Sequence, residues 1–490
     1  MGVGVSDPVS CDAERSVIIV GGGLAGLAAA VALAPRGFRV TLLESRQRLG
    51  GRAGSFTDPA TGQLVDACQH VSMGCCTNFA HFCRTVGISH LLAPQPKLHF
   101  VTPDRRTSVF KADPWPAPFH LGRALLGAHY LTPGDKLRVA WGMLALLCES
   151  PDADPPLLDW LKAHRQNART IERFWGVVLV SALNETVDRV GLKYARKVFR
   201  DGFIRHRDGF TVVVPTVPLG RFYGDELRGW LAAHGVELRE NAAVQKMRIA
   251  ECGMRNEDPN PPSSPTGSVP GFRIPHSAIR NVELRDGSTL SADHYVLAVP
   301  FDRVAGLLPD DLAADPYFAG ATHLTPSPIS SFHLWFDRPV MKLPHAVLVG
   351  CLGHWVFNRG EVSPGMFYIQ VVISAVRDVR DEGNAALMGR VVEELGRLFP
   401  AVRAAQLLRS KVVTEHAATF SAVPGVDQWR PVQASPVFNL AVAGDWTATG
   451  WPATMEGAVR SGYLAAEAIL ARAGRPERLV QSDLGRKSRV

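Results

Sequence analysis

The sequence predicts an α/β fold in which a Rossmann-like parallel sheet is interrupted by an inserted α+β domain. Residues 16–20 form a short apolar run that leads straight into a glycine-rich turn, and a helix-forming stretch follows as far as Leu33. Residues 39–43 form a second apolar run, which ends at Glu44. The order strand, glycine turn, helix, strand and acidic residue is typical of the βαβ unit that binds dinucleotides.

The glycine-rich turn contains Gly21, Gly22, Gly23 and Gly26. We expect Gly21 to permit the tight turn, Gly23 to let the backbone approach a pyrophosphate, and Gly26 to let the helix pack close to the sheet. The free amides and the dipole of the helix N-terminus attract phosphates, and Glu44 is placed to accept the ribose hydroxyls of an adenosine. The flanking strands and this acid favour a dinucleotide site over an ordinary glycine-rich turn.

A second glycine pair follows the acid. Gly50 and Gly51 lie among three basic residues, Arg46, Arg48 and Arg52. Glycines leave backbone amides exposed and arginines bind phosphates, so this segment suits the passage of a long phosphate and ribityl chain.

A third motif lies near the C-terminus. An apolar run over 440–443 ends at Gly444 and Asp445, and a helix-forming stretch continues through Leu470. Asp445 at a strand end can hold hydroxyls beside the pyrophosphate. Amides at the start of the last helix can face the pyrimidine edge of a flavin, where charge grows on reduction. The three motifs together predict a flavin dinucleotide.

The composition limits the classes of protein and of binding partner that remain possible. The chain has 490 residues, 46% hydrophobic and 20% charged, enough to bury a large core, and no apolar run is long enough to span a membrane. The net charge of +7 suits weak attraction to anionic lipid, but the basic residues are scattered, so we expect no nucleic-acid partner. None of the eight cysteines forms a Cys-x-x-Cys pair, which predicts reduced thiols and no metal site. The N-terminus lacks the pattern of an export signal. We therefore expect a cytoplasmic protein, with peripheral contact to the inner face of the cytoplasmic membrane as an open alternative.

The order of these pieces over residues 16–470 resembles the flavin-containing amine oxidase and phytoene desaturase superfamily. Within it, the chain most resembles the squalene-associated branch, the hydroxysqualene dehydroxylases. The segments that carry this resemblance are 66–71, 116–120, 182–184, 333–337, 355–359 and 445–458. One departure is Cys68, which stands where the family usually has glycine before Gln-His.

The resemblance implies an extended FAD and an allylic dehydroxylation in squalene and hopanoid biosynthesis, in which hydride from reduced flavin converts hydroxysqualene to squalene. It implies that Gln69 and His70 reach the flavin ring and act on the departing oxygen, although His70 can equally be a structural histidine. Glu456 fits a helix-start residue better than an acid. No electron donor is indicated. The implied cofactor-binding residues are Gly21, Gly22, Gly23, Gly26, Glu44, Ser45, Arg46, Gly50, Gly51, Arg52, Val244, Gly444, Asp445, Thr454, Met455 and Glu456.

Three other functions stay open. A carotenoid or phytoene-type desaturase would use the same flavin and a similar apolar site. An amine oxidase is less favoured because no feature specifically demands an amine. A non-catalytic isoprenoid carrier of the same fold would have no need for intact flavin motifs.

The predicted domains are discontinuous. A FAD-binding domain of the glutathione-reductase type is expected over 14–110, 210–300 and 411–472, and a substrate-binding domain over 111–209 and 301–410. Residues 251–275 read as a flexible insertion and 473–490 as a disordered tail.

The isoprenoid substrate predicts a long apolar pocket. Its candidate lining residues, for which ordinary core packing is the alternative, are Trp115, Phe119, Trp141, Trp160, Trp175, Trp335 and Trp355. The segment 119–148 mixes basic and apolar residues, so it can lie on a bilayer or form a plain amphipathic helix pair that faces the core.

Overall fold

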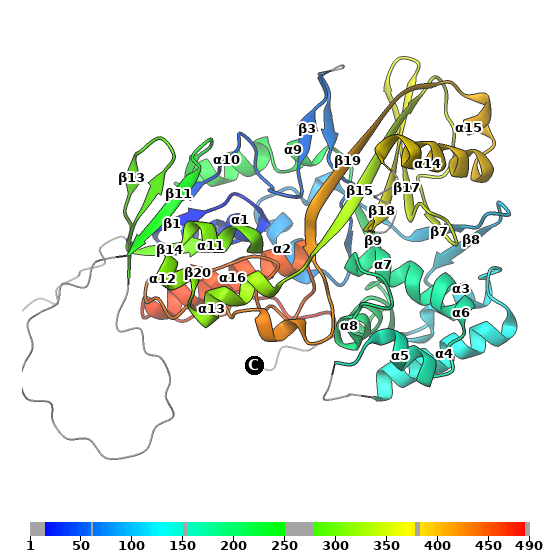
Figure 1. Cartoon of the computed structure of the whole chain (residues 1–490), viewed down its shortest axis with the longest axis horizontal. Coiled ribbons are helices and arrows are strands. Elements are labelled where there is room, and N and C mark those ends of the chain that lie inside the picture. Colours follow the sequence, from blue (N-terminus) through cyan, green and yellow to red (C-terminus); the bar gives the residue numbers. More distant parts are fainter. Residues whose placement is uncertain (1–14, 60–61, 150–153, 250–277, 378–382, 486–490) are drawn as a thin grey trace, which may run out of the picture.

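The computed structural model describes residues 15–59, 62–149, 154–249, 278–377 and 383–485. The predicted βαβ unit is present: β1 (Arg15–Val20), α1 (Leu24–Leu33) and β2 (Phe38–Leu43) follow one another as expected. They belong to a parallel sheet with the order β10-β2-β1-β14-β20, completed by β10 (Glu237–Arg239), β14 (His294–Leu297) and β20 (Leu440–Val442). The predicted Rossmann-like α/β class is confirmed (Figure 1).

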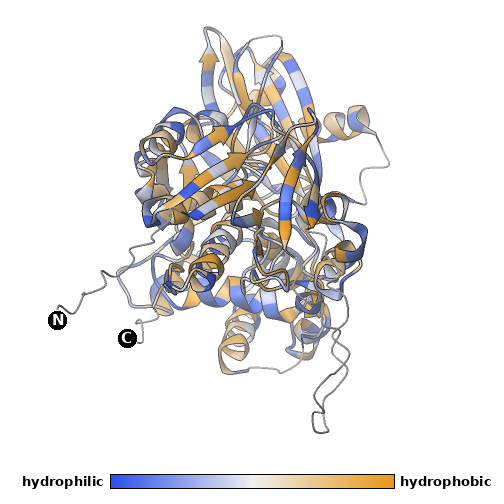
Figure 2. Cartoon of the chain, turned by 90° about the vertical axis from the view of Figure 1, so that its left-hand side faces the viewer, coloured by the Kyte–Doolittle hydropathy of each residue, from blue (hydrophilic) through white to orange (hydrophobic). Residues whose placement is uncertain are grey.

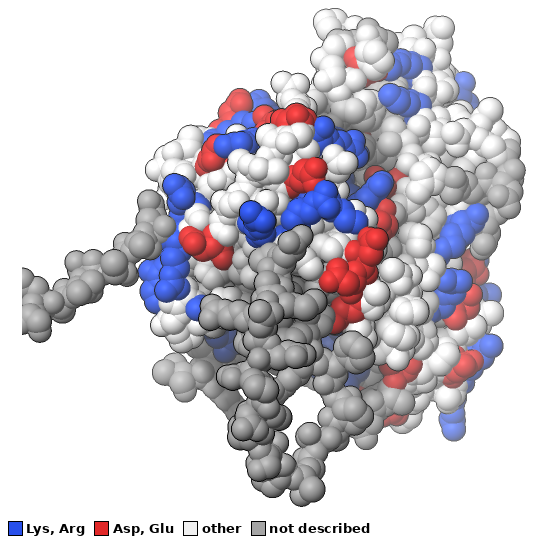
Figure 3. Space-filling view, turned by 60° about the vertical axis from the view of Figure 1, so that its left-hand side comes forward, with Lys and Arg blue, Asp and Glu red and all other residues white. Residues whose placement is uncertain are grey.

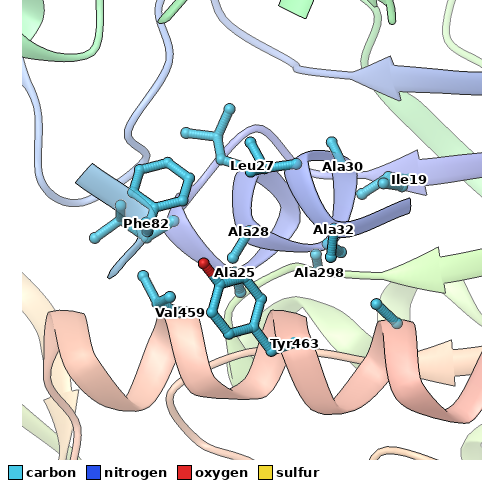
Figure 4. Close-up of a cluster of buried hydrophobic side chains, with 14 of the residues drawn as sticks. Ile19, Ala25, Leu27, Ala28, Ala30, Ala32, Phe82, Ala298, Val459 and Tyr463 are labelled. Atoms are coloured by element: carbon cyan, nitrogen blue, oxygen red, sulfur yellow. The ribbon is translucent and has the colours of Figure 1, made fainter. Parts of the chain in front are cut away.

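Both faces of this sheet are covered, which explains why its strands are apolar throughout. Val17 and Ile19 point into a core shared with α1 and with α16 (Met455–Arg472), whereas Ile18 and Val20 point into a second core on the opposite face. Every residue of α1 is buried, and its alanines allow α16 to approach closely (Figure 4).

A small antiparallel sheet follows the parallel one. It consists of β11 (Val244–Ile249), β12 (Ile279–Leu284) and β13 (Thr289–Leu290). β12 and β13 form a hairpin around Asp286-Gly287, with Val282 opposite Leu290. The predicted insertion over 251–275 lies outside the described residues. Basic and acidic side chains are interspersed on this end of the molecule (Figure 3).

A second large sheet rises away from the first (Figure 1). Its order is β19-β15-β18-β17-β16-β7-β8, and its strands, at the top of Figure 2, carry both hydrophilic and hydrophobic residues. The helices α14 (Asn384–Leu398) and α15 (Ala401–Ala404) pack on one face of it. The strands are β7 (Lys97–Val101), β8 (Thr107–Lys111), β15 (Pro326–Phe336), β16 (His345–Leu348), β17 (Trp355–Ser363), β18 (Met366–Ser374) and β19 (Leu407–Phe420).

The strands of this sheet cross two of the predicted domain boundaries. β7 and nearly all of β8 lie within the segment 14–110 that we assigned to the FAD-binding domain, and β19 crosses the boundary at 411. β7 joins because it pairs in parallel with β16, about 250 residues later in the chain. No local sequence pattern indicates a pairing between strands that are so far apart in the chain.

A helical region follows β8. Its elements are α3 (Gly122–Leu126), α4 (Pro133–Cys148), α5 (Leu157–Ala163), α6 (Ala168–Thr170), α7 (Val177–Leu183) and α8 (Leu192–Phe199), with π-helical turns at η4 (Ile171–Gly176) and η5 (Arg200–Ile204). A capping box between Thr132 and Asp135 begins α4. No helix among those that the structure describes is both long and apolar enough to cross a bilayer.

Shorter elements connect these parts. The remaining strands are β3 (Ser55–Thr57), β4 (Leu64–Asp66), β5 (Ser72–Met73), β6 (Leu92–Gln95) and β9 (Val212–Pro215). The remaining α-helices are α2 (Thr77–Thr85), α9 (Leu219–Phe222), α10 (Asp225–Ala233), α11 (Val304–Leu307), α12 (Asp310–Ala313) and α13 (Pro316–Ala319). The 3₁₀ turns are η1 (Ala34–Arg36), η2 (Ser89–Leu91), η3 (Phe119–Leu121), η6 (Phe301–Arg303), η7 (Gly320–His323) and η9 (Val426–Trp429).

The prediction of a disordered tail over 473–490 is wrong for residues 473–485. Leu479 is buried in the core beside α1, and its amide donates to the Glu467 carboxylate. Asp483 accepts a hydrogen bond from Arg460 at 3.0 Å. This segment is therefore held by specific contacts, through Asp483 to α16 and through Glu477 to Arg36. Residues 486–490 lie outside the described residues.

Candidate functional site

The glycine-rich turn after β1 is tightly enclosed by backbone. Gly21 has a φ of +111°, and a Cβ there would lie 2.5 Å from the carbonyl oxygen of Ala298. A Cβ on Gly26 would lie 2.0 Å from the carbonyl oxygen of Gly21. Both positions exclude any side chain, which brings the start of α1 close to the ends of β1 and β14.

The N-terminus of α1 is open to an anion. Its N-cap residue, Gly23, has an extended backbone, no side chain caps the helix, and its first turn has no acidic residue. The amides of this turn are therefore left for another acceptor. Gly50 and Gly51 lie directly against this turn: the Gly50 amide donates to the Gly22 carbonyl at 2.9 Å, and a Cβ on Gly51 would lie 3.2 Å from the Cα of Gly23.

Glu44 lies at the end of β2, as the sequence predicts. Its buried carboxylate accepts hydrogen bonds from the Gly22 amide at 2.9 Å and the Arg46 amide at 2.8 Å. Ser45 donates its hydroxyl to the same carboxylate at 3.0 Å. The Ala242 amide donates to the Glu44 carbonyl at 2.8 Å, which places the start of β11 and Val244 on this side of the turn. These contacts bring the residues implied for the adenosine end together.

An ion pair joins the second glycine segment to the C-terminal motif. Arg52 contacts the buried Asp445 at 2.5 Å and donates to the Ala418 carbonyl at 2.8 Å. Gly444, with a φ of +150°, precedes Asp445, and its amide donates to the Ser461 hydroxyl in α16 at 2.8 Å. The structure thus places residues nearly 400 positions apart at one site.

The start of α16 has two different roles. The Thr454 hydroxyl caps the helix by accepting from the Gly457 amide at 3.0 Å. The fully buried Glu456 carboxylate turns away to the start of α2, where it accepts from the Asn78 amide and side chain and from the Phe79 amide at 2.8–3.1 Å. Glu456 therefore behaves as the helix-start residue that the sequence favours, because its carboxylate is occupied by α2.

Replacing Glu456 with glutamine is expected to lower the free energy of unfolding by about 2 kcal/mol. The isosteric amide keeps one acceptor but points its NH₂ group at neighbouring N–H donors, which leaves buried polar groups unsatisfied. Denaturant unfolding of the two proteins without FAD measures the loss. Glu393→Gln is the control, because Glu393 is a mostly exposed residue of α14 and its replacement is expected to have little effect. Equal stability of the Glu456 variant and the native protein would contradict this role.

The candidate catalytic residues follow β4. The Nδ1 atom of His70 lies 3.0 Å from the Cys68 carbonyl oxygen, and Gln69 is buried. A carbonyl only accepts, so Nδ1 carries the hydrogen and the neutral ring presents a bare Nε2. Burial lowers the pKa of His70, with a further contribution from the Arg52 charge against opposing ones from Cys68 and Asp66. His70 is therefore neutral near pH 7.

Arg359 is a site residue that the sequence did not single out. From β17 its Nη1 donates to the Oε1 of Gln69 at 2.9 Å. The sequence analysis used the segment 355–359 only as part of the family resemblance. Arg359 belongs to that segment and could have been found from it. The Nε2 of Gln69 in turn donates to the backbone carbonyl of His70 at 3.1 Å. We call Arg359, Gln69 and His70 the polar chain; its link to His70 runs through the backbone and not through the imidazole.

The proposed pocket-lining aromatics divide into three groups. Trp160, Trp175 and Trp335 are buried in cores. Trp355 is half-buried and donates its ring N–H to Ser181 at 2.9 Å. Trp115, Phe119 and Trp141 are exposed, so the prediction that they line an internal pocket is wrong.

The family comparison agrees with this geometry. The flavin containing amine oxidoreductase family matches residues 24–199 and 271–470, and the chain belongs to this family. It is therefore a flavin oxidoreductase with FAD as its cofactor. The uncapped α1 turn, the stacked glycine pairs and the position of Glu44 fit this group.

Individual relatives are distant but cover nearly the whole chain. A 15-cis-phytoene desaturase from Synechococcus elongatus is 26% identical over 93% of this chain and 96% of its own length. A hydroxysqualene dehydroxylase from Zymomonas mobilis is also 26% identical, over 92% of this chain and 98% of its own length. Among solved structures, a cyclohexylamine oxidase from Brevibacterium oxydans has a TM-score of 0.65 at 18% identity, covering 94% of this chain and all of its own. An oxidoreductase from Methanosarcina mazei has a TM-score of 0.66 at 16% identity, covering 91% and 98%.

Proposed function

We propose that this protein reduces hydroxysqualene to squalene with reduced FAD. The observation that carries the proposal is the polar chain of Arg359, Gln69 and His70, which lies near the charges of Asp66 and Arg52 and has apolar side chains on its flank. Val71, Met73 and Trp355, which flank this chain in sequence, all pack against one hydrophobic cluster. A hydrocarbon substrate offers nothing for a guanidinium or an imidazole to bind, and enclosing such groups costs desolvation. A substrate hydroxyl would give them a partner. The dehydroxylase among the relatives supports the same assignment.

The reaction balances with one proton and one hydride. When bound in its reduced form, FAD would supply the hydride and with it two electrons. The allylic C–O bond of the substrate breaks, the hydroxyl takes a proton and leaves as water, and a new C–H bond forms. In the proposed arrangement His70 holds the proton at Nε2, and Gln69, oriented by Arg359, donates a hydrogen bond to the departing oxygen. The apolar surroundings exclude water from the developing allylic cation.

A phytoene-type desaturase is the second candidate. The similarity of the chain to the cyanobacterial 15-cis-phytoene desaturase favours it. In that reaction the substrate loses a hydride and a proton, so the bare Nε2 of a neutral His70 would act as a base. The two candidates therefore need opposite protonation states of one residue. A non-catalytic carrier would require neither protonation state of His70.

Anaerobic incubation with chemically reduced FAD and hydroxysqualene is expected to produce squalene, detected by mass spectrometry. Arg359→Met is expected to lower the rate about 100-fold, because it removes the group that orients Gln69. Arg338→Met is the matched control, since Arg338 lies beyond β15 and is largely exposed. Phytoene desaturation by the oxidised enzyme without squalene formation would overturn the proposal. Failure to retain FAD or convert either substrate would favour the carrier.

A further inference from the structure

A cluster of apolar side chains lies exposed on η3, α3, α4 and the loop before them. Trp115, Phe119, Leu126, Leu137, Trp141 and Leu144 are each 50–73% exposed, and we call these six residues the α3–α4 face. They are six of the thirteen exposed large hydrophobic residues in the described chain, and they fall within 30 consecutive positions. Such a concentration marks an interaction surface, whereas single exposed apolar residues are ordinary.

The outward side of α4 has the spacing of a binding stripe. Leu137, Trp141 and Leu144 recur at i, i+4 and i+7, so they share one side of the helix. The inward side is also apolar, because Val139 and Leu146 are buried in cores. An ordinary surface helix has a polar outer side. The apolar outer side of α4 therefore has no partner within the described chain.

The pieces of the face are joined to one another. Arg123 of α3 reaches Asp113, two residues before Trp115, at 3.8 Å. Lys136 of α4 donates to the Leu126 carbonyl, the last residue of α3. These contacts connect the segments that carry the six apolar residues, and Figure 1 places α3 and α4 at the end of the molecule opposite the parallel sheet.

The accessible charge around this face is positive. Between residues 111 and 148 the basic residues are Lys111, Arg123, Lys136 and Arg138, and all of them reach solvent at least in part. Asp113 and Asp135 are the two acidic residues of this segment, and both are buried. Glu149, just beyond α4, is an exposed acidic residue, but its carboxylate is paired with the ring N–H of Trp160 and with His164. Exposed tryptophan, phenylalanine and leucine with cations around them match the interfacial zone of an anionic bilayer.

An apolar cluster connects this region to the candidate site. Phe110, Tyr130 and Val139 belong to one cluster, and Leu125 of α3 packs against it. Val71 and Trp355 pack against the same cluster beside the Gln69–His70 segment. The helices α3 and α4, which carry most of the exposed face, therefore also contribute side chains to the apolar cluster that flanks the polar chain.

We propose that the α3–α4 face docks on an anionic lipid bilayer, from which the isoprenoid substrate enters. The docking rests on the exposed residues and their charge, and the delivery of substrate rests on the function proposed above. Leu137, Trp141 and Leu144 enter the acyl boundary, while Arg123 and Arg138 contact phosphate headgroups.

Flotation of the FAD-loaded protein with phosphatidylcholine vesicles, with and without phosphatidylglycerol, tests the docking. We expect binding to the phosphatidylglycerol vesicles that weakens at high salt, and about tenfold or greater loss of binding for Leu137→Glu/Trp141→Glu. Val432→Glu/Phe438→Glu is the matched control, because both residues are exposed and apolar but lie on the loop before β20. It is expected to float like the native protein. Retained flavin absorbance verifies that each variant is folded.

Three results would overturn the proposal. The first is a native protein that does not float, and the second is a Leu137/Trp141 variant that floats as well as the native protein. The third is a lipid-independent dimer by light scattering that only the Leu137/Trp141 variant dissociates, which would assign the face to a second copy of the chain. Flotation needs no substrate, so its failure leaves the proposed reaction standing, and a failed squalene assay leaves the flotation result intact.

Discussion

Replacing Gly26 with alanine is expected to abolish FAD retention and to lower the free energy of unfolding by about 3 kcal/mol. The new Cβ would lie 2.0 Å from the carbonyl oxygen of Gly21 and 3.2 Å from a side-chain carbon of Ile19. The closer neighbour is backbone, so no side-chain rotation relieves the clash. The helix α1 must move away from β1, and the open amides at its start then lose their position relative to Gly50 and Gly51.

Gly229→Ala separates this clash from a general effect of alanine in a helix. Gly229 lies inside α10, where a Cβ would meet no atom within 4 Å. Helix propensity predicts that this change stabilises the protein by up to about 1 kcal/mol. Visible flavin absorbance after gel filtration measures retention, and denaturant unfolding of the FAD-free proteins measures stability without the contribution of bound ligand. A Gly26 variant that retains flavin and unfolds like the native protein would contradict the assigned role.

The nucleotide-binding part of the fold was predictable because its signals are local. β1, the glycine turn, α1 and β2 form one continuous segment, and each element is specified by its own residues. The hairpin around Asp286-Gly287 is local in the same way. The second sheet could not be predicted in this way, since β7 pairs with β16 and β19 pairs with β15. The residues of a strand do not indicate which distant strand it pairs with.

The contacts of the candidate site also differ in this way: the local ones could be predicted from the sequence, and the long-range ones could not. Glu44 contacts the glycine turn only 22 positions away, and the sequence placed it correctly. Arg359 and Gln69 are 290 positions apart, and the contact between Glu456 and Asn78 spans 378. We expected the exposed tryptophans to be buried, because an apolar helix pattern predicts burial. However, α4 is apolar on both sides, and only the tertiary structure shows which of the two sides is covered.

The rate of squalene formation is expected to rise as the pH falls toward the pKa of His70. Burial sets that pKa below 6.5, so near pH 7 the ring is mostly neutral with its hydrogen on Nδ1. A proton donor must be the imidazolium, whose fraction falls about tenfold for each pH unit above the pKa. A desaturase that uses His70 as a base shows the opposite slope, because the neutral ring is then the active form.

His70→Gln isolates this residue from other groups that titrate in the same range. Glutamine keeps a hydrogen-bond donor but cannot transfer a proton, so the rate is expected to fall about 100-fold or more and its pH dependence in this range to disappear. His90→Gln is the matched control, because His90 makes the same kind of Nδ1 contact to a backbone carbonyl, at 3.0 Å from Gly87, but is exposed. Steady-state rates from pH 5 to 8 with reduced FAD measure all three proteins. A His70 variant that keeps the native slope would mean that the departing oxygen takes its proton from another source. A native rate of squalene formation that rises with pH would likewise contradict the role of His70 as the proton donor.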